Sequence, residues 1–185
     1  MNEYNLTYEK IKREDVGFLL QCYKEDYGKI KITDYSEMFR GFNKAKLNEE
    51  NKNKIDVLLF EEVIDDAGEY YIFDFQIGKV IISASDDFVQ EDDIVGEADE
   101  LIKEEIGNLF DLYDVYTWSV EKKKEYDINV MDDGYANWSI NIKFSNNEVY
   151  VLSGNGINDE YAPEDLDLFV EDLKALATSS ATENS

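Results

Sequence analysis

The acidic residues of this chain are concentrated after residue 54, and any fold that it adopts has to keep them on its surface. Residues 1–54 contain 11 Lys and Arg and 10 Asp and Glu, a net charge of +1. Residues 55–185 contain 7 Lys and Arg and 33 Asp and Glu, a net charge of −26. Because carboxylates are rarely buried without a partner, the second part of the chain has to wrap an acidic surface around its core.

The chain has enough apolar material to form that core. Of its 185 residues, 43% are apolar and 14% are aromatic. Disordered acidic proteins are poor in aromatic and β-branched residues. The composition therefore predicts a folded chain with one ordinary domain, or one domain and a small appended unit.

Several functional classes are excluded because residue types are missing. The chain has no histidine, which excludes catalytic relays and metal sites that depend on imidazole. Cys22 is the one cysteine, so the chain forms no internal disulfide and no paired-cysteine zinc or redox motif. No apolar run has the length of a membrane span, and the first 15 residues lack the apolar core of a secretory signal. We therefore expect a cytoplasmic protein that needs no cofactor and contacts no membrane.

The neutral first segment predicts a pair of helices. Residues 13–27 place apolar side chains at helical spacing, and Gly28 follows as a stop signal. Residues 36–50 predict a second helix with Phe39 on its apolar face. The polar run at residues 48–54 has no apolar residue to anchor it and is the best candidate for a linker.

After residue 54 the pattern changes to strands, because the segments are rich in β-branched and aromatic residues and Gly68 and Gly78 mark turns between them. The predicted strands are residues 55–64, 69–77, 79–85, 112–120, 126–131, 136–144 and 148–154. Ser145, Asn146 and Asn147 form a good hairpin turn between the last two. Strands that follow one another without crossover helices favour an antiparallel sheet.

Two further helices are predicted, each with an apolar stripe and an almost purely acidic opposite face. In residues 91–110 the stripe is formed by Ile94, Ala98, Leu101, Ile102, Ile106 and Leu109. In residues 163–177, which begin at Pro163, it is formed by Leu166, Phe169, Val170, Leu173 and Leu176. Pro is favoured at the first position of a helix.

The sequence thus predicts an α+β fold with an N-terminal helical pair followed by a mostly antiparallel sheet with two acidic helices. We expect three parts along the chain. They are a neutral helical segment at residues 1–54, an acidic α+β domain at residues 55–177 and a disordered tail at residues 178–185.

The candidate functional residues are carboxylates in two arrays. The first array has twelve acids in residues 86–114, opposed locally by Lys103 alone, and the second lies in residues 159–172. From both we single out as partner-binding candidates Asp86, Asp87, Glu91, Asp92, Asp93, Glu97, Glu100, Glu104, Glu105, Glu164, Asp165, Asp167, Glu171 and Asp172. The plainer interpretation of these residues is a solvated surface that keeps the protein in solution.

Carboxylates along a rigid helix can occupy the Lys and Arg sites that otherwise grip phosphates. A DNA duplex carries one charge per roughly 1.7 Å of its axis. Two or three acids in each helical turn of about 5.4 Å give a comparable density. Direct binding to nucleic acid is disfavoured by the same charge, because the phosphates would be repelled.

In size, charge and lack of histidine, the chain resembles the DNA-mimic inhibitors carried by phages and mobile elements, among them anti-CRISPR and anti-restriction proteins. This resemblance implies a non-enzymatic inhibitor that acts in the cytoplasm of a bacterial host cell. It implies that the inhibitor binds the basic nucleic-acid-binding surface of a target such as a Cas nuclease or a restriction enzyme.

A more local resemblance covers residues 136–176. This segment resembles a hairpin-then-helix module of uncharacterised proteins from Gram-positive bacteria and their mobile elements, in which a Trp strand, a Ser-Gly turn, a Pro and an apolar helix recur. No activity follows from it. We interpret Trp138 as a core aromatic residue and Gly154 as a turn glycine.

Two alternative functions remain open. The first is an immunity protein that neutralises a basic nuclease toxin by the same electrostatics. The second is an enzyme that depends on a metal held by carboxylates, because Asp86-Asp87, Asp92-Asp93 and Asp132-Asp133 offer paired oxygen ligands. In a chain with 43 acids such pairs are expected by chance.

Overall fold

The computed structural model describes Ile32, Tyr35, Phe39 and residues 42–64, 67–85, 88–119, 137–157 and 162–180. The strands are β1 (Asn43–Lys44), β2 (Ile55–Ile64), β3 (Ala67–Asp74), β4 (Lys79–Ser83), β5 (Ile94–Gly96), β6 (Asn137–Phe144) and β7 (Glu148–Asn155). The α-helices described over their full length are α4 (Glu100–Leu112) and α5 (Leu166–Ser179), and short 3-10 helices lie at Glu91–Asp93 and Val115–Thr117. None of the described helices is long and apolar enough to cross a membrane.

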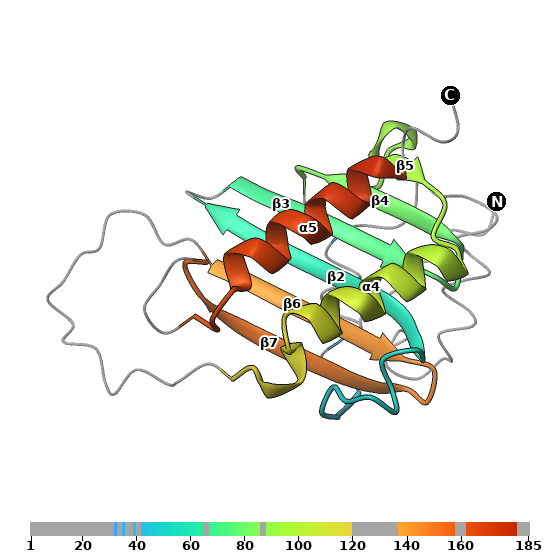
Figure 1. Cartoon of the computed structure of the whole chain (residues 1–185). Coiled ribbons are helices and arrows are strands. Elements are labelled where there is room, and N and C mark those ends of the chain that lie inside the picture. Colours follow the sequence, from blue (N-terminus) through green and yellow to red (C-terminus); the bar gives the residue numbers. More distant parts are fainter. Residues whose placement is uncertain are drawn as a thin grey trace, which may run out of the picture.

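The strands form one mixed sheet in the order β1-β7-β6-β2-β3-β4-β5 (Figure 1). β1 runs parallel to β7, and all other neighbours in the sheet are antiparallel. β2 is the central strand, and its Phe60 lies opposite both Tyr71 of β3 and Ile140 of β6. The turn between β6 and β7 closes at Asn147, whose φ of 62° is a left-handed conformation that Asn tolerates.

Both faces of the sheet carry a buried apolar cluster, because side chains alternate along each strand. In β2, Leu58 and Phe60 pack with residues of α4 and α5 on one face. Val57 and Leu59 belong to the cluster on the opposite face, which also contains Phe39. β2 is buried on both faces, and this explains its continuous apolar run. Such runs are typical of strands that are covered on two sides.

The structure corrects the predicted fold class. The chain forms a seven-stranded mixed sheet with its helices at Glu100–Leu112 and Leu166–Ser179, not an N-terminal helical pair followed by a mostly antiparallel sheet. The helix predicted over residues 13–27 lies outside the described residues. The helix predicted over residues 36–50 is helical at Phe39 but does not reach residue 50, because Asn43–Lys44 pairs with β7 as a strand.

The first half of the helix predicted over residues 91–110 is also wrong. Ile94–Gly96 is strand β5, paired with β4. Gly96 lies against the end of α5, where an added Cβ would come within 2.5 Å of the Ser180 carbonyl oxygen. The helix instead starts after Asp99, whose carboxylate accepts hydrogen bonds of 3.0 Å from the backbone N–H groups of Leu101 and Ile102.

Of the other predicted strands, some are confirmed and one is wrong. The strands predicted at residues 55–64, 136–144 and 148–154 are confirmed, with shifts of one residue at most. The strand predicted at residues 112–120 is wrong, since this segment ends α4 and then forms a 3-10 helix with Val115 buried. The strand predicted at residues 126–131 lies outside the described residues.

The C-terminal helix begins and ends later than predicted. α5 starts at Leu166 rather than at Pro163, because Asp165 just before it has a left-handed backbone with φ 61°. It continues to Ser179, into the segment predicted as a tail, and residues 181–185 lie outside the described residues. Trp138 is confirmed as a core residue, whereas Gly154 lies within β7, where an added Cβ would come within 2.9 Å of the Trp138 ring.

Candidate partner-binding surface

Helices α4 and α5 lie side by side on one face of the sheet (Figure 1). The rings of Phe110 and Phe169 stack with their centroids 6.1 Å apart, and the Tyr113 ring meets Phe169 edge-on at 6.0 Å. The Tyr113 hydroxyl donates a hydrogen bond of 2.6 Å to the Asp172 carboxylate. These contacts hold the end of α4 against the first half of α5.

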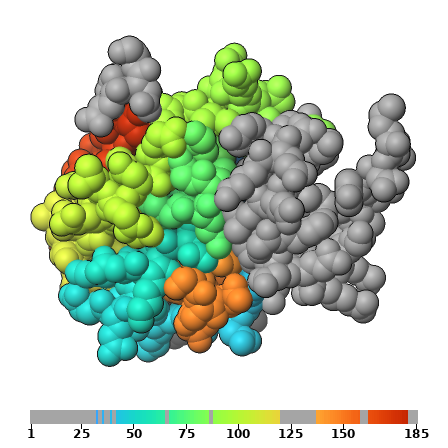
Figure 2. Space-filling view, turned by 90° about the vertical axis from the view of Figure 1, so that its right-hand side faces the viewer, coloured from blue at the N-terminus to red at the C-terminus, as the bar shows by residue number. Residues whose placement is uncertain are grey.

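The two helices and the turn before α5 expose the carboxylates that the sequence predicted there. We call these residues the acidic layer: Glu100, Glu104, Glu105, Glu164, Asp165, Asp167, Glu171 and Asp172. They face outward because Ile106 and Phe110 of α4, and Phe169 and Leu173 of α5, are buried towards the sheet. In the space-filling view α4 lies at the surface in yellow-green, with part of α5 beside it in red (Figure 2).

The remaining candidate acids lie outside the acidic layer. Glu91 and Asp92 are exposed on the connection between β4 and β5. Asp93 is half-buried there, and its carboxylate accepts a 2.7 Å hydrogen bond from the backbone N–H of Gln90. Asp86 and Asp87 lie outside the described residues, as does the Asp132-Asp133 pair. The structure therefore brings together the acids of α4 and α5 but not those of residues 91–93.

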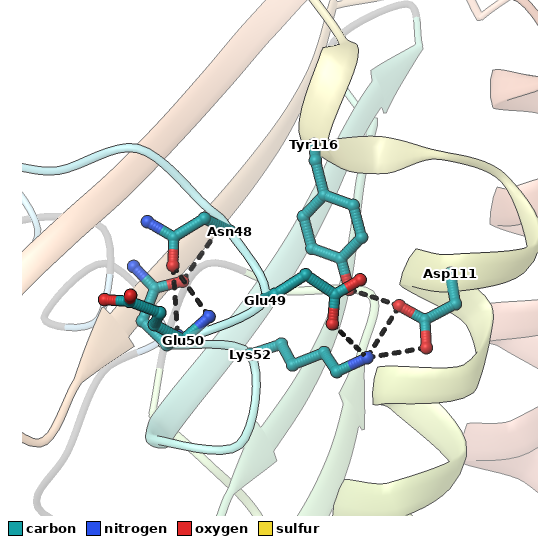
Figure 3. A network of polar contacts seen from close by, with 7 residues as sticks. Asn48, Glu49, Glu50, Lys52, Asp111 and Tyr116 are labelled. Atoms are coloured by element: carbon teal, nitrogen blue, oxygen red, sulfur yellow. Dashed lines mark hydrogen bonds and ion pairs between the residues drawn. The ribbon is translucent and has the colours of Figure 1, made fainter.

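Lysines distant in the sequence oppose two acids of the first array, in addition to Lys103 within it. Lys79 of β4 forms an ion pair with Glu97. Lys52, in the loop before β2, places its Nζ 2.6 Å from Asp111 and 2.9 Å from Glu49 (Figure 3). The loop is thereby tied to the end of α4.

Asp111 is the centre of this polar network (Figure 3). Hydrogen bonds from Lys52 and then from the Tyr116 hydroxyl lower the pKa of the Asp111 carboxyl. The pKa of Tyr116 is raised, first by burial and then by its bond to Asp111. Because 59 residues separate Lys52 from Asp111, no local sequence pattern could have predicted this pair.

The two lysines of the helices do not neutralise most of the acidic layer. Lys103 pairs with Glu100 at 3.0 Å and lies 4.8 Å from the centre of the Phe75 ring. Lys174 turns towards the sheet, where it pairs with Glu62 at 2.8 Å and with Glu69 at 3.1 Å. Among the described residues, the acids without an ion pair include Glu104, Glu105, Asp167 and Glu171.

Three leucines are exposed on the outer sides of the two acidic helices. Their exposure was not predicted from the sequence. Leu101 and Leu112 of α4 are 70% and 68% exposed, and Leu168 of α5 is 47% exposed. Leu101 was predicted to be buried because Ile94 and Ala98 set the phase of the apolar stripe. Neither residue belongs to α4. The predicted stripe is confirmed at Ile102, Ile106 and Leu109, which lie in the core or pack against it, and is wrong at Leu101.

The opposite face of the sheet holds a separate buried polar cluster. The Asp74 carboxylate is 2% exposed and accepts hydrogen bonds from the Tyr35 hydroxyl at 3.0 Å and the Ile77 backbone N–H at 3.2 Å. Burial raises the pKa of Asp74 to about 6. Lys143 is likewise buried and pairs with Asp56 at 2.7 Å. This cluster ties Tyr35 to the sheet.

A shallow pocket of about 360 Å³ lies on the same face as this cluster, across the ends of β2, β6 and β7. Glu61, Ser139 and Ser153 form one cross-strand row in it, and Asn137 lies opposite Asn155 in the next row. Its hydroxyls, amides and single carboxylate suit small polar ligands. None of the acidic layer contributes to it.

No family model matches the chain, and no curated protein and no solved structure matches it either.

Proposed function

We propose that this protein is a non-enzymatic inhibitor that binds the basic nucleic-acid-binding surface of a target protein, such as a Cas nuclease or a restriction enzyme. One observation carries the proposal: α4 and α5 lie side by side on one face of the sheet and turn their carboxylates outward. These outward carboxylates make this face of the molecule negative, as a surface that takes the place of phosphates requires.

The support for these carboxylates is rigid, which favours binding. The stacked rings of Phe110 and Phe169 and the buried side chains beneath them fix the two helices on the sheet. The helix backbone that carries the acids therefore loses little conformational freedom on binding, which leaves more of the interaction energy for affinity. A net charge of −25 also steers the protein towards basic surfaces and raises the association rate at low salt.

Competition with DNA tests the proposal. A guide-loaded Cas nuclease is incubated first with this protein and then with labelled target DNA, and binding of the DNA is measured by fluorescence anisotropy over a range of salt concentrations. The wild type should prevent the DNA from binding. The variant Glu104→Gln/Glu105→Gln/Glu171→Gln should bind about tenfold more weakly at low salt, with a smaller dependence of affinity on salt.

A matched control separates the acidic layer from the overall charge. Ala67→Lys/Ala84→Lys/Ser145→Lys changes the net charge by the same amount at exposed positions outside α4 and α5. This control should keep most of the wild-type affinity. Equal losses in the two variants would show that only the total charge matters, and no loss in either would move the interface away from the acidic layer. Inhibition of a nuclease toxin in place of a Cas nuclease or restriction enzyme would support the immunity alternative.

A further inference from the structure

We infer that the acidic layer binds a basic amphipathic helix of its partner, and that Leu101, Leu112 and Leu168 are the apolar contacts for that helix. This inference rests on the proposed function and specifies the partner of the same surface. A surface that only replaces phosphates would contact the charged ends of Lys and Arg. It would gain little from exposed leucines.

The leucines of α4 lie in one outward-facing stripe. Leu101, Glu105, Asn108 and Leu112 follow one another at intervals of four, three and four residues, which places them on one side of a helix. All four are exposed. Because the helix rises about 1.5 Å per residue, the two leucines are about 16 Å apart, the length of three turns of a partner helix.

Leu168 continues this surface on α5. It precedes Phe169, which stacks on Phe110, and lies one helical turn before Asp172, which accepts the hydrogen bond from Tyr113. The contacts that join the two helices thus bring the end of α4, where Leu112 lies, towards the start of α5. Leu112 and Leu168 therefore lie on the two helices near the place where they meet, and Leu101 lies about three turns away along α4.

Acids flank Leu101 and Leu168 and determine what can cover them. Glu104 and Glu105 follow Leu101 by three and four residues, and Glu171 and Asp172 follow Leu168 in the same way. A partner that buries the leucines has to bring basic side chains next to its apolar ones, as a basic amphipathic helix does. A second copy of this chain would bring the same acids against them, and an anionic lipid surface would be repelled.

Burial of the leucines supplies affinity that charge alone does not. Burial of a leucine removes apolar surface from water, and this contribution does not depend on ion pairs. A single exposed leucine is ordinary in a folded protein. Three leucines on the outer sides of two adjoining acidic helices form a surface that an apolar partner side chain can use.

Two synthetic peptides of equal lysine and leucine content provide the test. In the amphipathic peptide the leucines follow one face of a helix, and in the scrambled peptide they do not. Binding to the full-length protein is measured by calorimetry at several salt concentrations. The wild type should bind the amphipathic peptide about tenfold more tightly than the scrambled one.

Substitutions identify the contribution of the leucines. Leu101→Ser/Leu112→Ser/Leu168→Ser should remove the preference for the amphipathic peptide and leave the salt dependence of binding unchanged. Because these side chains are exposed, circular dichroism should show an intact fold. Ile64→Ser, at an exposed apolar residue of β2 outside the acidic layer, should keep the preference.

The outcomes distinguish this inference from the proposed function. Equal binding of the two peptides, with no effect of the leucine substitutions, would overturn the inference and leave a surface that recognises charge alone. Failure of both peptides to bind at low salt would count against the proposed function, and the inference would fall with it.

Discussion

Tyr113, one residue after α4, donates a hydrogen bond of 2.6 Å to Asp172 of α5. The bond to the carboxylate, together with desolvation, raises the pKa of Tyr113 to about 12. The same ring contacts Phe169 edge-on. One side chain therefore joins the two helices that carry the acidic layer through a polar contact and an aromatic contact.

Replacement of the Tyr113 hydroxyl should destabilise the protein only slightly. Tyr113→Phe keeps the ring contact and loses an exposed hydrogen bond, so the free energy of unfolding at pH 7 should fall by no more than about 1 kcal/mol. Urea denaturation followed by circular dichroism measures the change. In an Asp172→Asn background Tyr113→Phe should cost less, and an equal cost there would show that the bond does not couple the two residues.

Truncation of Phe169 should have a much larger effect. Phe169 is fully buried among Phe110, Tyr113 and Trp118, with ring centroids 5.3 to 6.1 Å away. Phe169→Ala should lower the free energy of unfolding by about 3–5 kcal/mol, because it leaves a cavity between the helices and the sheet. The neighbouring Leu168→Ala is a control at an exposed position and should cost far less. Similar costs at the two positions would contradict the observed packing.

The buried Asp74 should make the stability depend on pH. Its pKa rises from an ordinary value of 3.8 to about 6 in the folded protein. Between these values the folded protein binds a proton that the unfolded chain has released, so stability falls as the pH rises from about 4 to 6. Below about pH 4 the contribution of the protonated Asp74 carboxyl to stability is fully present, and above about pH 6 this contribution is lost.

Asp74→Asn isolates this contribution, since the amide oxygen can accept from the Ile77 N–H while the amide NH2 donates to the Tyr35 hydroxyl oxygen. The stability of the variant relative to the wild type should increase between pH 4 and pH 7, by about 1.4 kcal/mol for each unit by which the pKa is raised. Chemical denaturation at several pH values measures the difference. A difference that does not change with pH would contradict a raised pKa at Asp74.

Salt should stabilise the protein. The net charge of −25 produces long-range repulsion, and physiological salt shortens its range to about 8 Å. The same salt weakens ion pairs such as Lys79–Glu97, but exposed pairs contribute only about 0–1 kcal/mol. The melting temperature should therefore rise with added NaCl. Glu104→Gln/Glu105→Gln/Glu171→Gln should melt higher than the wild type at low salt, and a flat or falling response would contradict the account.

The parts of the fold that local pattern determines could be predicted from the sequence. β2 occupies residues 55–64, as its content of β-branched and aromatic residues indicates. In α5 the predicted residues Leu166, Phe169 and Leu173 are buried. The exposure of the acids on both helices follows from the same periodicity, because the charged residues fall between the apolar ones.

The parts that depend on distant partners could not be predicted. β1 has two polar residues and is a strand only because β7 pairs with it. β5 has three residues, and it forms between β4 and the end of α5. Ile94 falls at helical spacing from Ile102. Periodicity alone therefore predicted a helix that begins too early, and it placed Leu101 in the core.

The molar ratio of protein to nuclease at which inhibition is complete tests the central proposal, that this protein is an inhibitor, most directly. A guide-loaded Cas nuclease is titrated with the protein and its DNA cleavage is measured, with target DNA added either before or after the inhibitor. The account predicts that inhibition ends at a fixed molar ratio and that DNA bound beforehand protects the nuclease. Inhibition far below one equivalent, with a chemically modified nuclease or a cleaved guide RNA, would contradict it.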